Sequence, residues 1–266
     1  TETVQAQDPG RMIAIVGDAE MDEGNMYEAL LEGRKHDLRN CWWIIDYNRQ
    51  SLDAVVSDRM FRWIDRTFRN TGWTVVTLKY GKRMMAAFGK PGGRTLKRWI
   101  NDCPNDLYSA LTFQGGTHWR QQLTADIGQE DGVQDLLADY DDGQLQDLMT
   151  NLGGHCLETI LEAFASITDD TPACFIAYTI KGHGLPLAGH KDNHAGPMSL
   201  EHMAEFQARM RVPAGQEWEP MAGLDIDPEE LREFLDHVPF AQGPARRRRA
   251  AKIAVPSTLP KPETDK

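Results

Sequence analysis

Two short apolar runs, about thirty residues apart, constrain the fold of this chain more than any other feature. Residues 12–16 and 41–45 are apolar at every position, without the alternation expected of a strand with one face in water. Such runs are typical of strands that are buried on both faces of a parallel sheet. Residues 22–35 lie between them, with apolar residues at helical spacing and acids in the first turn. The segment therefore predicts a strand–helix–strand unit with a right-handed crossover.

Oxygen-bearing side chains stand just past the end of each predicted strand. Gly17-Asp18 follows the first run, and Asp46-Tyr47-Asn48 closes the second. Ligands of parallel sheets bind at the carboxyl ends of the strands, where hard cations prefer oxygen ligands and a helix N-terminus favours phosphate. We expect Asp18, Asn48 and a backbone carbonyl near Gln50 to hold a metal–diphosphate group. The alternative is an ordinary Gly-Asp turn and an asparagine at a strand end.

The remaining pattern predicts an α/β fold, a parallel sheet flanked by helices. Further strands are expected at 73–78 and 174–179, and a Pro/Gly turn at 89–93. Helices are expected at 56–69, 94–103, 131–150 and 155–167. The last strand would deliver Lys181 and a glycine-rich loop to the sheet edge that carries Asp18 and Asn48.

The composition changes near residue 212. Residues 1–211 are predicted to form the α/β domain, entered through a loop at 1–10. Residues 212–266 are interrupted by prolines, with one short helix near 228–237, and are predicted to be a connector towards a further domain. The four arginines at 246–249 are interpreted as part of a solvated linker.

Charge and cysteine content exclude several classes of protein. The chain has 266 residues and a formal net charge of −11, which argues against a nucleic-acid-binding or anionic-membrane surface. No apolar stretch approaches the length of a membrane helix, and the N-terminus has no signal segment. The aspartates at 131, 135, 139, 141 and 142 are interpreted as a solvated helical face. The four widely spaced cysteines are interpreted as buried thiols of a cytoplasmic protein; they are Cys41, Cys103, Cys156 and Cys174.

A histidine-rich loop adds a further candidate. His183, His190 and His194 fall in a segment that glycines and Pro186 keep from being helical, so their spacing gives little support to a zinc site. His194 is either a loop histidine in water or a group that donates to a diphosphate oxygen and moves protons near neutral pH.

Several motifs in the same order resemble one known family. Residues 17–23 and 46–53 resemble the thiamine-diphosphate signature of the transketolase superfamily, and are most similar to the decarboxylating component of homodimeric, bacterial-type pyruvate dehydrogenases. Residues 179–184 and 191–194 continue the resemblance, which runs from about Arg11 to the region of Pro256. Two positions depart from the family pattern. Ala19 replaces a glycine, and Tyr47 replaces the first asparagine of a pair.

The resemblance implies a role for each matching position. It implies Mg²⁺ ligation by Asp18, Asn48 and the main-chain oxygen of Gln50. It implies contacts to thiamine diphosphate from Gly17, Ala19, Glu20, Asn48, Gln50, Lys181 and His194. It implies catalytic roles for His194 near the reacting centre, Lys181 at the entrance, and Glu23 at the interface of a homodimer.

The implied activity is the decarboxylation of a 2-oxo acid, pyruvate above all, downstream of glycolysis, with transfer of the acyl unit to the lipoyl group of an acyltransferase partner. A transketolase-type reaction on sugar phosphates is the first alternative, and a non-catalytic interaction module, for which Ala19 is the hint, is the second. The family also needs a pyrimidine-binding domain, expected downstream of residue 266, and substrate-contacting histidines, expected upstream of Thr1. We therefore expect the chain alone to be inactive.

Overall fold

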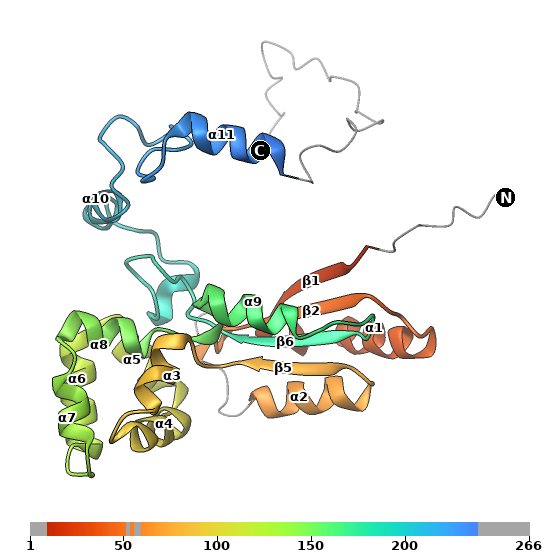
Figure 1. Ribbon diagram of the computed structural model, residues 1–266, viewed down its shortest axis with the longest axis horizontal. Coiled ribbons are helices and arrows are strands. Elements are labelled where there is room, and N and C mark those ends of the chain that lie inside the picture. Colours follow the sequence, from red (N-terminus) through yellow and green to blue (C-terminus); the bar gives the residue numbers. More distant parts are fainter. Residues whose placement is uncertain (1–9, 52–53, 56–59, 239–266) are drawn as a thin grey trace, which may run out of the picture. The chain divides into compact units, whose positions relative to one another are not determined.

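The computed structural model describes residues 10–51, 54–55 and 60–238 (Figure 1). The strands are β1 (Met12–Gly17), β2 (Cys41–Tyr47), β3 (Gln50–Ser51), β4 (Ala54–Val55), β5 (Thr74–Leu78) and β6 (Ala173–Tyr178). The first α-helices are α1 (Gly24–Lys35), α2 (Met60–Asn70), α3 (Lys82–Phe88), α4 (Gly93–Asp102), α5 (Asn105–Gln114) and α6 (Gly116–Ile127). They are followed by α7 (Val133–Ala138), α8 (Asp142–Met149), α9 (Leu157–Ala165), α10 (Leu200–Arg209) and α11 (Pro228–His237). Short 3₁₀ helices are η1 (Asp18–Asp22), η2 (Gly153–His155) and η3 (Lys191–His194).

A four-stranded parallel sheet in the order β1-β2-β6-β5 forms the centre of the fold and confirms the predicted α/β class. The four predicted strands are all present, with ends shifted by one or two residues. The prediction that the first strand is buried on both faces is wrong, because β1 lies at the end of the sheet order and Met12, Ile13 and Ile15 are exposed. Gly17 at the end of β1 pairs with Asp46 near the end of β2, and Asp46 in turn pairs with Ala177 of β6. The polar residues after these strands therefore emerge at one edge of the sheet.

Helices cover the two faces of the sheet, with α2 and α9 on opposite sides (Figure 1). On one face, Ile64 and Phe68 of α2 join Ile45 and Ile176 in the larger apolar core. On the other face, Trp42, Leu78 and Phe175 pack with Ala163 and Phe164 of α9. All of β6 is buried, as expected of a central parallel strand.

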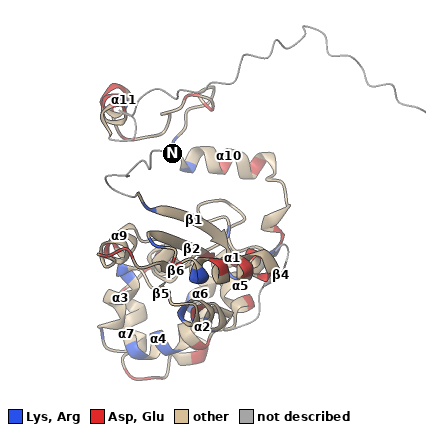
Figure 2. Cartoon of the chain, turned by 90° about the vertical axis from the view of Figure 1, so that its right-hand side faces the viewer, with Lys and Arg blue, Asp and Glu red and all other residues tan. Residues whose placement is uncertain are grey.

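A block of six helices, α3 to α8, separates β5 from the segment that leads into α9. Tyr80 and Leu152 form an isolated antiparallel bridge at the two ends of this block, so the chain leaves and re-enters at the same place. The block contributes its own fully buried side chains, among them Trp119, Leu123 and Leu145. Basic α3 and acidic α9 lie close together (Figure 2), and the Lys82 Nζ donates to Glu162 Oε1 at 2.6 Å.

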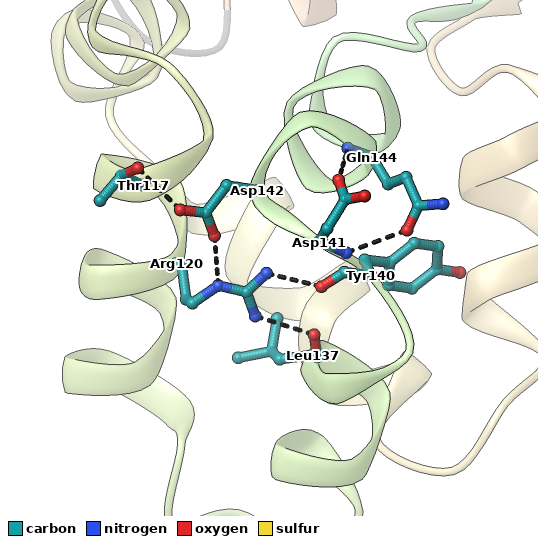
Figure 3. A network of polar contacts seen from close by, with 7 residues as sticks. All are labelled: Thr117, Arg120, Leu137, Tyr140, Asp141, Asp142 and Gln144. Carbon is teal, nitrogen blue, oxygen red and sulfur yellow. Dashed lines mark hydrogen bonds and ion pairs between the residues drawn. The ribbon is translucent and has the colours of Figure 1, made fainter.

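The prediction of one helix over 131–150 is wrong, because residues 139–141 break it into α7 and α8. Asp141 caps α8: its carboxylate accepts from the Gln144 N–H at 2.7 Å, while the Gln144 side chain accepts from the Asp141 N–H. Asp142 accepts from Arg120 Nε at 2.5 Å and from the Thr117 hydroxyl (Figure 3). Asp141 and Asp142 therefore fix the junctions between α6, α7 and α8. Asp131, Asp135 and Asp139 are exposed as predicted, but they do not lie on the face of one continuous helix.

Other predictions differ from the structure in detail. The turn at 89–93 is confirmed by Gly92 with φ 74°, and α4, α9 and α11 lie where helices were expected. Helices α3, α5, α6 and α10 were missed. All four cysteines are free, but only Cys41 and Cys174 are buried, whereas Cys103 and Cys156 are half-buried.

The chain divides into two compact units, residues 1–206 and 207–266. In the second unit, α11 is capped by the Asp227 carboxylate, which accepts from the Glu229 N–H at 2.8 Å. The expected entry loop at 1–10, Leu52, Asp53 and the arginines at 246–249 lie wholly or mainly outside the described residues. None of the described helices has the length and apolar character needed to cross a membrane.

Candidate functional site

Asp18 lies at the end of β1 with its carboxylate turned into the protein. Its side chain is only 3% exposed, and its Oδ2 accepts from the Arg49 N–H at 2.7 Å. Arg49 can present that N–H because its backbone is left-handed, with φ 67°. Burial above all, with a smaller contribution from the nearby Asp46 charge, raises the pKa of Asp18 to about 6. A buried carboxylate of this kind gains most from a bound cation.

Asn48 is held in place by the residue two positions before it. Its Nδ2 donates to Asp46 Oδ2 at 3.2 Å, while its Oδ1 accepts from the Gln50 N–H at 2.9 Å. The other oxygen of Asp46 accepts from the Thr179 hydroxyl of the segment after β6. Because one amide atom of Asn48 donates and the other accepts, these bonds determine the orientation of the amide. Its oxygen has a second lone pair that could bind a cation. Asp46 and Thr179 were not predicted as site residues, although both lie inside the motifs.

Gln50 connects this turn to the loop that follows β6. Its side chain is buried, and its Nε2 donates to the Gly189 carbonyl at 3.3 Å and to Ser109 Oγ at 3.4 Å. Its Oε1 is buried and has no hydrogen-bond partner. An unpaired buried acceptor is costly, so this oxygen also suits a cation or a donor from a ligand.

Lys181 and His194, predicted separately from the loop, lie side by side. The Lys181 Nζ is 3.2 Å from His194 Nδ1, and the Asn193 Nδ2 donates to the Lys181 carbonyl at 2.6 Å. Gly182, with φ 71°, makes this turn possible, and a Cβ there would meet the Asn193 side chain. Since Gly189 contacts Gln50, the loop is joined to the Asp18–Asn48 cluster.

The other predicted positions lie in or beside η1. The Gly17 N–H donates to Glu20 Oε2 at 2.6 Å, so the Glu20 carboxylate covers the first turn that was predicted to receive a diphosphate. Ala19 is half-buried between them. Glu23 is exposed where η1 joins α1. A diphosphate that used the Gly17 N–H would have to displace Glu20.

The three loop histidines have different neighbours. His183 stacks on His155 with the ring centroids 3.7 Å apart, and His190 packs against Phe113 at 4.6 Å. His155 was assigned no role from the sequence, but its Nε2 accepts from the Ile180 N–H at 2.8 Å and so anchors the start of the Lys181 loop. Burial lowers the pKa of His155 to about 4, which keeps its ring neutral at physiological pH.

The oxygen donors at the ends of β1 and β2 fit a hard cation that also carries phosphate. One carboxylate, one amide oxygen and main-chain oxygens are a typical protein share for Mg²⁺, which takes its remaining ligands from substrate phosphates and water. Within the described residues there is no group of three or more His, Cys, Asp or Glu side chains arranged for a metal. The donor set therefore favours a metal held jointly with a ligand over an all-protein metal centre.

Comparisons with known proteins find relatives that share one name. No protein-family model matches the chain. It is 28% identical over 237 residues to the pyruvate dehydrogenase E1 component of Escherichia coli K12, covering 86% of this chain and 25% of that protein. It is 24% identical over 265 residues to the protein of the same name in Cupriavidus necator, covering 91% of this chain and 28% of that protein. It is 24% identical over 266 residues to the protein of the same name in Mycolicibacterium smegmatis, covering 92% of this chain and 28% of that protein. The chain thus spans about a quarter of the length of these relatives.

Proposed function

We propose that this chain, a relative of the pyruvate dehydrogenase E1 components along about nine tenths of its length, is the diphosphate- and metal-binding part of a thiamine-diphosphate-dependent 2-oxo acid dehydrogenase. One observation carries the proposal. The ends of β1 and β2 bring the buried Asp18 carboxylate, the Asn48 amide and the Gln50 backbone into one hydrogen-bonded turn. That turn lies at the carboxyl edge of a parallel sheet, where such ligands bind.

Each residue of the turn has a physical task in this proposal. Asp18 supplies the negative charge for Mg²⁺, and Asn48 and the main-chain oxygen of Gln50 supply neutral oxygens. Asp46 and Thr179 are positioning residues, because they orient the Asn48 amide. The backbone N–H groups at the start of η1 are proposed to bind the diphosphate once the Glu20 carboxylate is displaced from the Gly17 N–H. When bound, thiamine diphosphate supplies the carbanion chemistry, and the chain supplies binding and orientation.

The Lys181–His194 pair is proposed to serve the reacting end of the site. The Lys181 ammonium lies 3.2 Å from His194 Nδ1, which accepts from it, and the pair suits the recognition of an anionic substrate and the movement of a proton. The substrate is proposed to be pyruvate or another 2-oxo acid, and the acceptor a lipoyl group within a multienzyme complex, because the relatives are named as components of pyruvate dehydrogenase. Glu23, which is exposed, is proposed to lie at a homodimer interface.

The proposal is tested by titrating the full chain with thiamine diphosphate in a calorimeter, with and without Mg²⁺. We expect saturable binding that needs Mg²⁺ and that weakens by about tenfold or more in Asp18→Asn, since the variant loses the charged ligand. Asp22→Asn is the matched control, because Asp22 is exposed in the same 3₁₀ helix.

The two outcomes are distinct. Equal affinity with Mg²⁺ and with a chelator, or an unchanged affinity in Asp18→Asn, would contradict the metal–diphosphate assignment. A loss of affinity for thiamine diphosphate in Asp18→Asn, without a similar loss in Asp22→Asn, would support the metal–diphosphate assignment. Turnover belongs to a separate assay, in which we expect the chain alone not to decarboxylate pyruvate.

A further inference from the structure

A polar cavity lies beside the turn that contains Asn48 and Gln50, and Arg49 of that turn lines it. It has a volume of about 90 Å³ and lies among residues at or just after the ends of β2, β5 and β6 and at the α4–α5 junction. Arg49 and Lys79 contribute positive charges to its lining, and Tyr47, Tyr108 and Tyr178 contribute aromatic rings. None of these five residues belongs to the predicted cofactor set. The cavity is therefore a separate feature that needs its own explanation.

Arg49 is a buried cation without a full set of partners. The residue is only 8% exposed, and its Nε is buried and has no hydrogen-bond partner. Its guanidinium lies 4.5 Å from the ring centroid of Tyr108 and 6.0 Å from that of Tyr178. Among the ion pairs of the described residues, none includes Arg49. Stacking on tyrosine stabilises the guanidinium, but it leaves the in-plane N–H donors available.

Lys79 brings a second positive charge to the same space. Its Nζ donates to Asn101 Oδ1 at 2.5 Å and lies 5.4 Å from the ring centroid of Tyr178. Burial above all, with a smaller contribution from the Arg49 charge, lowers the pKa of Lys79 to about 8, and the charge of Asp102 at the exposed rim opposes the shift. The ammonium is still mainly charged at neutral pH. Two cations thus face one small cavity at an electrostatic cost.

Two of the three tyrosine hydroxyls in the lining take part in hydrogen bonds within the protein. The Tyr108 hydroxyl donates to the Met149 carbonyl, and the Tyr47 hydroxyl accepts from the Phe61 N–H at 3.3 Å. Helix α5 begins at Asn105, which lines the cavity, and a helix N-terminus adds positive potential. The lining therefore places two cationic donors beside tyrosine rings, and these two charges outnumber its one carboxylate, Asp102, so the cavity favours a compact anion over a neutral molecule.

We propose that this cavity binds a small oxyanion, a carboxylate or an inorganic phosphate, between the Arg49 guanidinium and the Lys79 ammonium. Arg49 also joins the cavity to the neighbouring turn, because its backbone N–H donates to Asp18 Oδ2. An anion bound to the Arg49 guanidinium therefore also helps to fix the Arg49 backbone that holds Asp18. The binding site itself does not depend on the proposed function.

The test titrates the full chain with sodium phosphate and with sodium acetate in a calorimeter, at constant ionic strength in chloride and with a chelator present. We expect one saturable site for at least one of the two anions. Lys79→Gln should weaken that binding at least tenfold, whereas Lys79→Arg should keep it within about threefold, since the charge remains. Lys79 is altered because Arg49 also supports Asp18. The matched control is Lys82→Gln, which removes the same charge from an exposed lysine three residues away.

Each result has one meaning. Stronger binding of phosphate would identify a phosphate site, and stronger binding of acetate a carboxylate site. The proposal would be overturned by no saturable binding of either anion, by an unchanged affinity in Lys79→Gln, or by an equal loss in Lys82→Gln. Circular dichroism of each variant checks the fold. If Lys79→Gln does not fold, the titration of the parent chain still decides, because the absence of saturable binding of both anions overturns the proposal. Because no metal or thiamine diphosphate is present, failure here is separate from failure of the proposed function.

Discussion

The Asp18 carboxylate places opposite demands on binding and on stability. A cation at the sheet edge needs a charged oxygen ligand, but burial of that charge costs free energy when no cation is present. The Arg49 N–H offsets part of the cost, and the raised pKa of Asp18 shows that burial prevails. A site of this type is therefore a locally unfavourable arrangement that a ligand corrects.

Asp18→Asn is expected to stabilise the metal-free chain near pH 7.5. The pKa of Asp18 is about 6 in the folded chain against 3.8 for a free side chain, so folding takes up a proton between these values. Stability contributed by the protonated carboxyl is present below about pH 4 and is lost as the pH rises to about 6. Above pH 6 the amide should increase the free energy of unfolding by about 1–3 kcal/mol. Urea denaturation measured from pH 4 to 8 gives this difference.

The control for this prediction is Asp22→Asn, which should leave the free energy of unfolding within about 0.5 kcal/mol of the parent chain. Two results would contradict a buried charge that destabilises the fold. One is a lower free energy of unfolding in Asp18→Asn than in the parent chain at pH 7.5, and the other is a gain at pH 4 as large as the gain at pH 7.5. Addition of Mg²⁺ and thiamine diphosphate should stabilise the parent chain and not the variant.

The sequence predicted where Asp18 and Asn48 lie in the fold better than it predicted the residues that hold them there. Asp18 and Asn48 follow unbroken apolar runs, so their place at the carboxyl ends of two parallel strands could be predicted from those runs and the helix between them. Arg49 holds Asp18 only because its backbone is left-handed. His155 anchors a loop that begins 25 residues later in the sequence. Such long-range hydrogen bonds leave no periodic pattern in a single sequence.

At the scale of elements, polar junctions decide where the helices of the α3–α8 block end. The Arg120 side chain joins three of them: its Nε donates to Asp142, its NH1 to the Leu137 carbonyl at 2.9 Å and its NH2 to the Tyr140 carbonyl at 2.6 Å (Figure 3). The sequence did contain the start of α8 as an Asp-x-x-Gln capping box at Asp141 and Gln144. The acidic run concealed that signal, because aspartates at helical spacing also suit an exposed face.

Arg120→Gln is expected to destabilise the chain by about 1–3 kcal/mol, because the two carbonyls lose a charged donor and Asp142 loses its ion pair. The free energy of unfolding in urea measures the total effect. Amide hydrogen exchange should increase first in α7 and α8, whereas β6 should stay protected. Arg94→Gln, an exposed change in α4, is the matched control. Uniformly faster exchange in α7 and β6 would show that the network does not act locally.

At the scale of the whole molecule, every residue of both candidate sites belongs to the first compact unit, residues 1–206. The sheet order β1-β2-β6-β5 could not be predicted, because the six-helix block between β5 and β6 hides their adjacency in the sequence. In the second unit, none of the described residues 207–238 is buried. Stability and ligand binding should therefore reside in the first unit.

A chain shortened to end at Arg211 tests this division, because it keeps α10 whole and removes α11. We expect the free energy of unfolding to change by less than about 1 kcal/mol, since α11 buries no residue. The affinities for Mg²⁺–thiamine diphosphate and for the small oxyanion should both stay within about twofold of those of the full chain, because no lining residue is removed. Calorimetry of the two chains under identical conditions gives the comparison. A loss of either affinity by about tenfold would mean that residues beyond Arg211 complete that site, and would limit the proposed assignment to the longer chain.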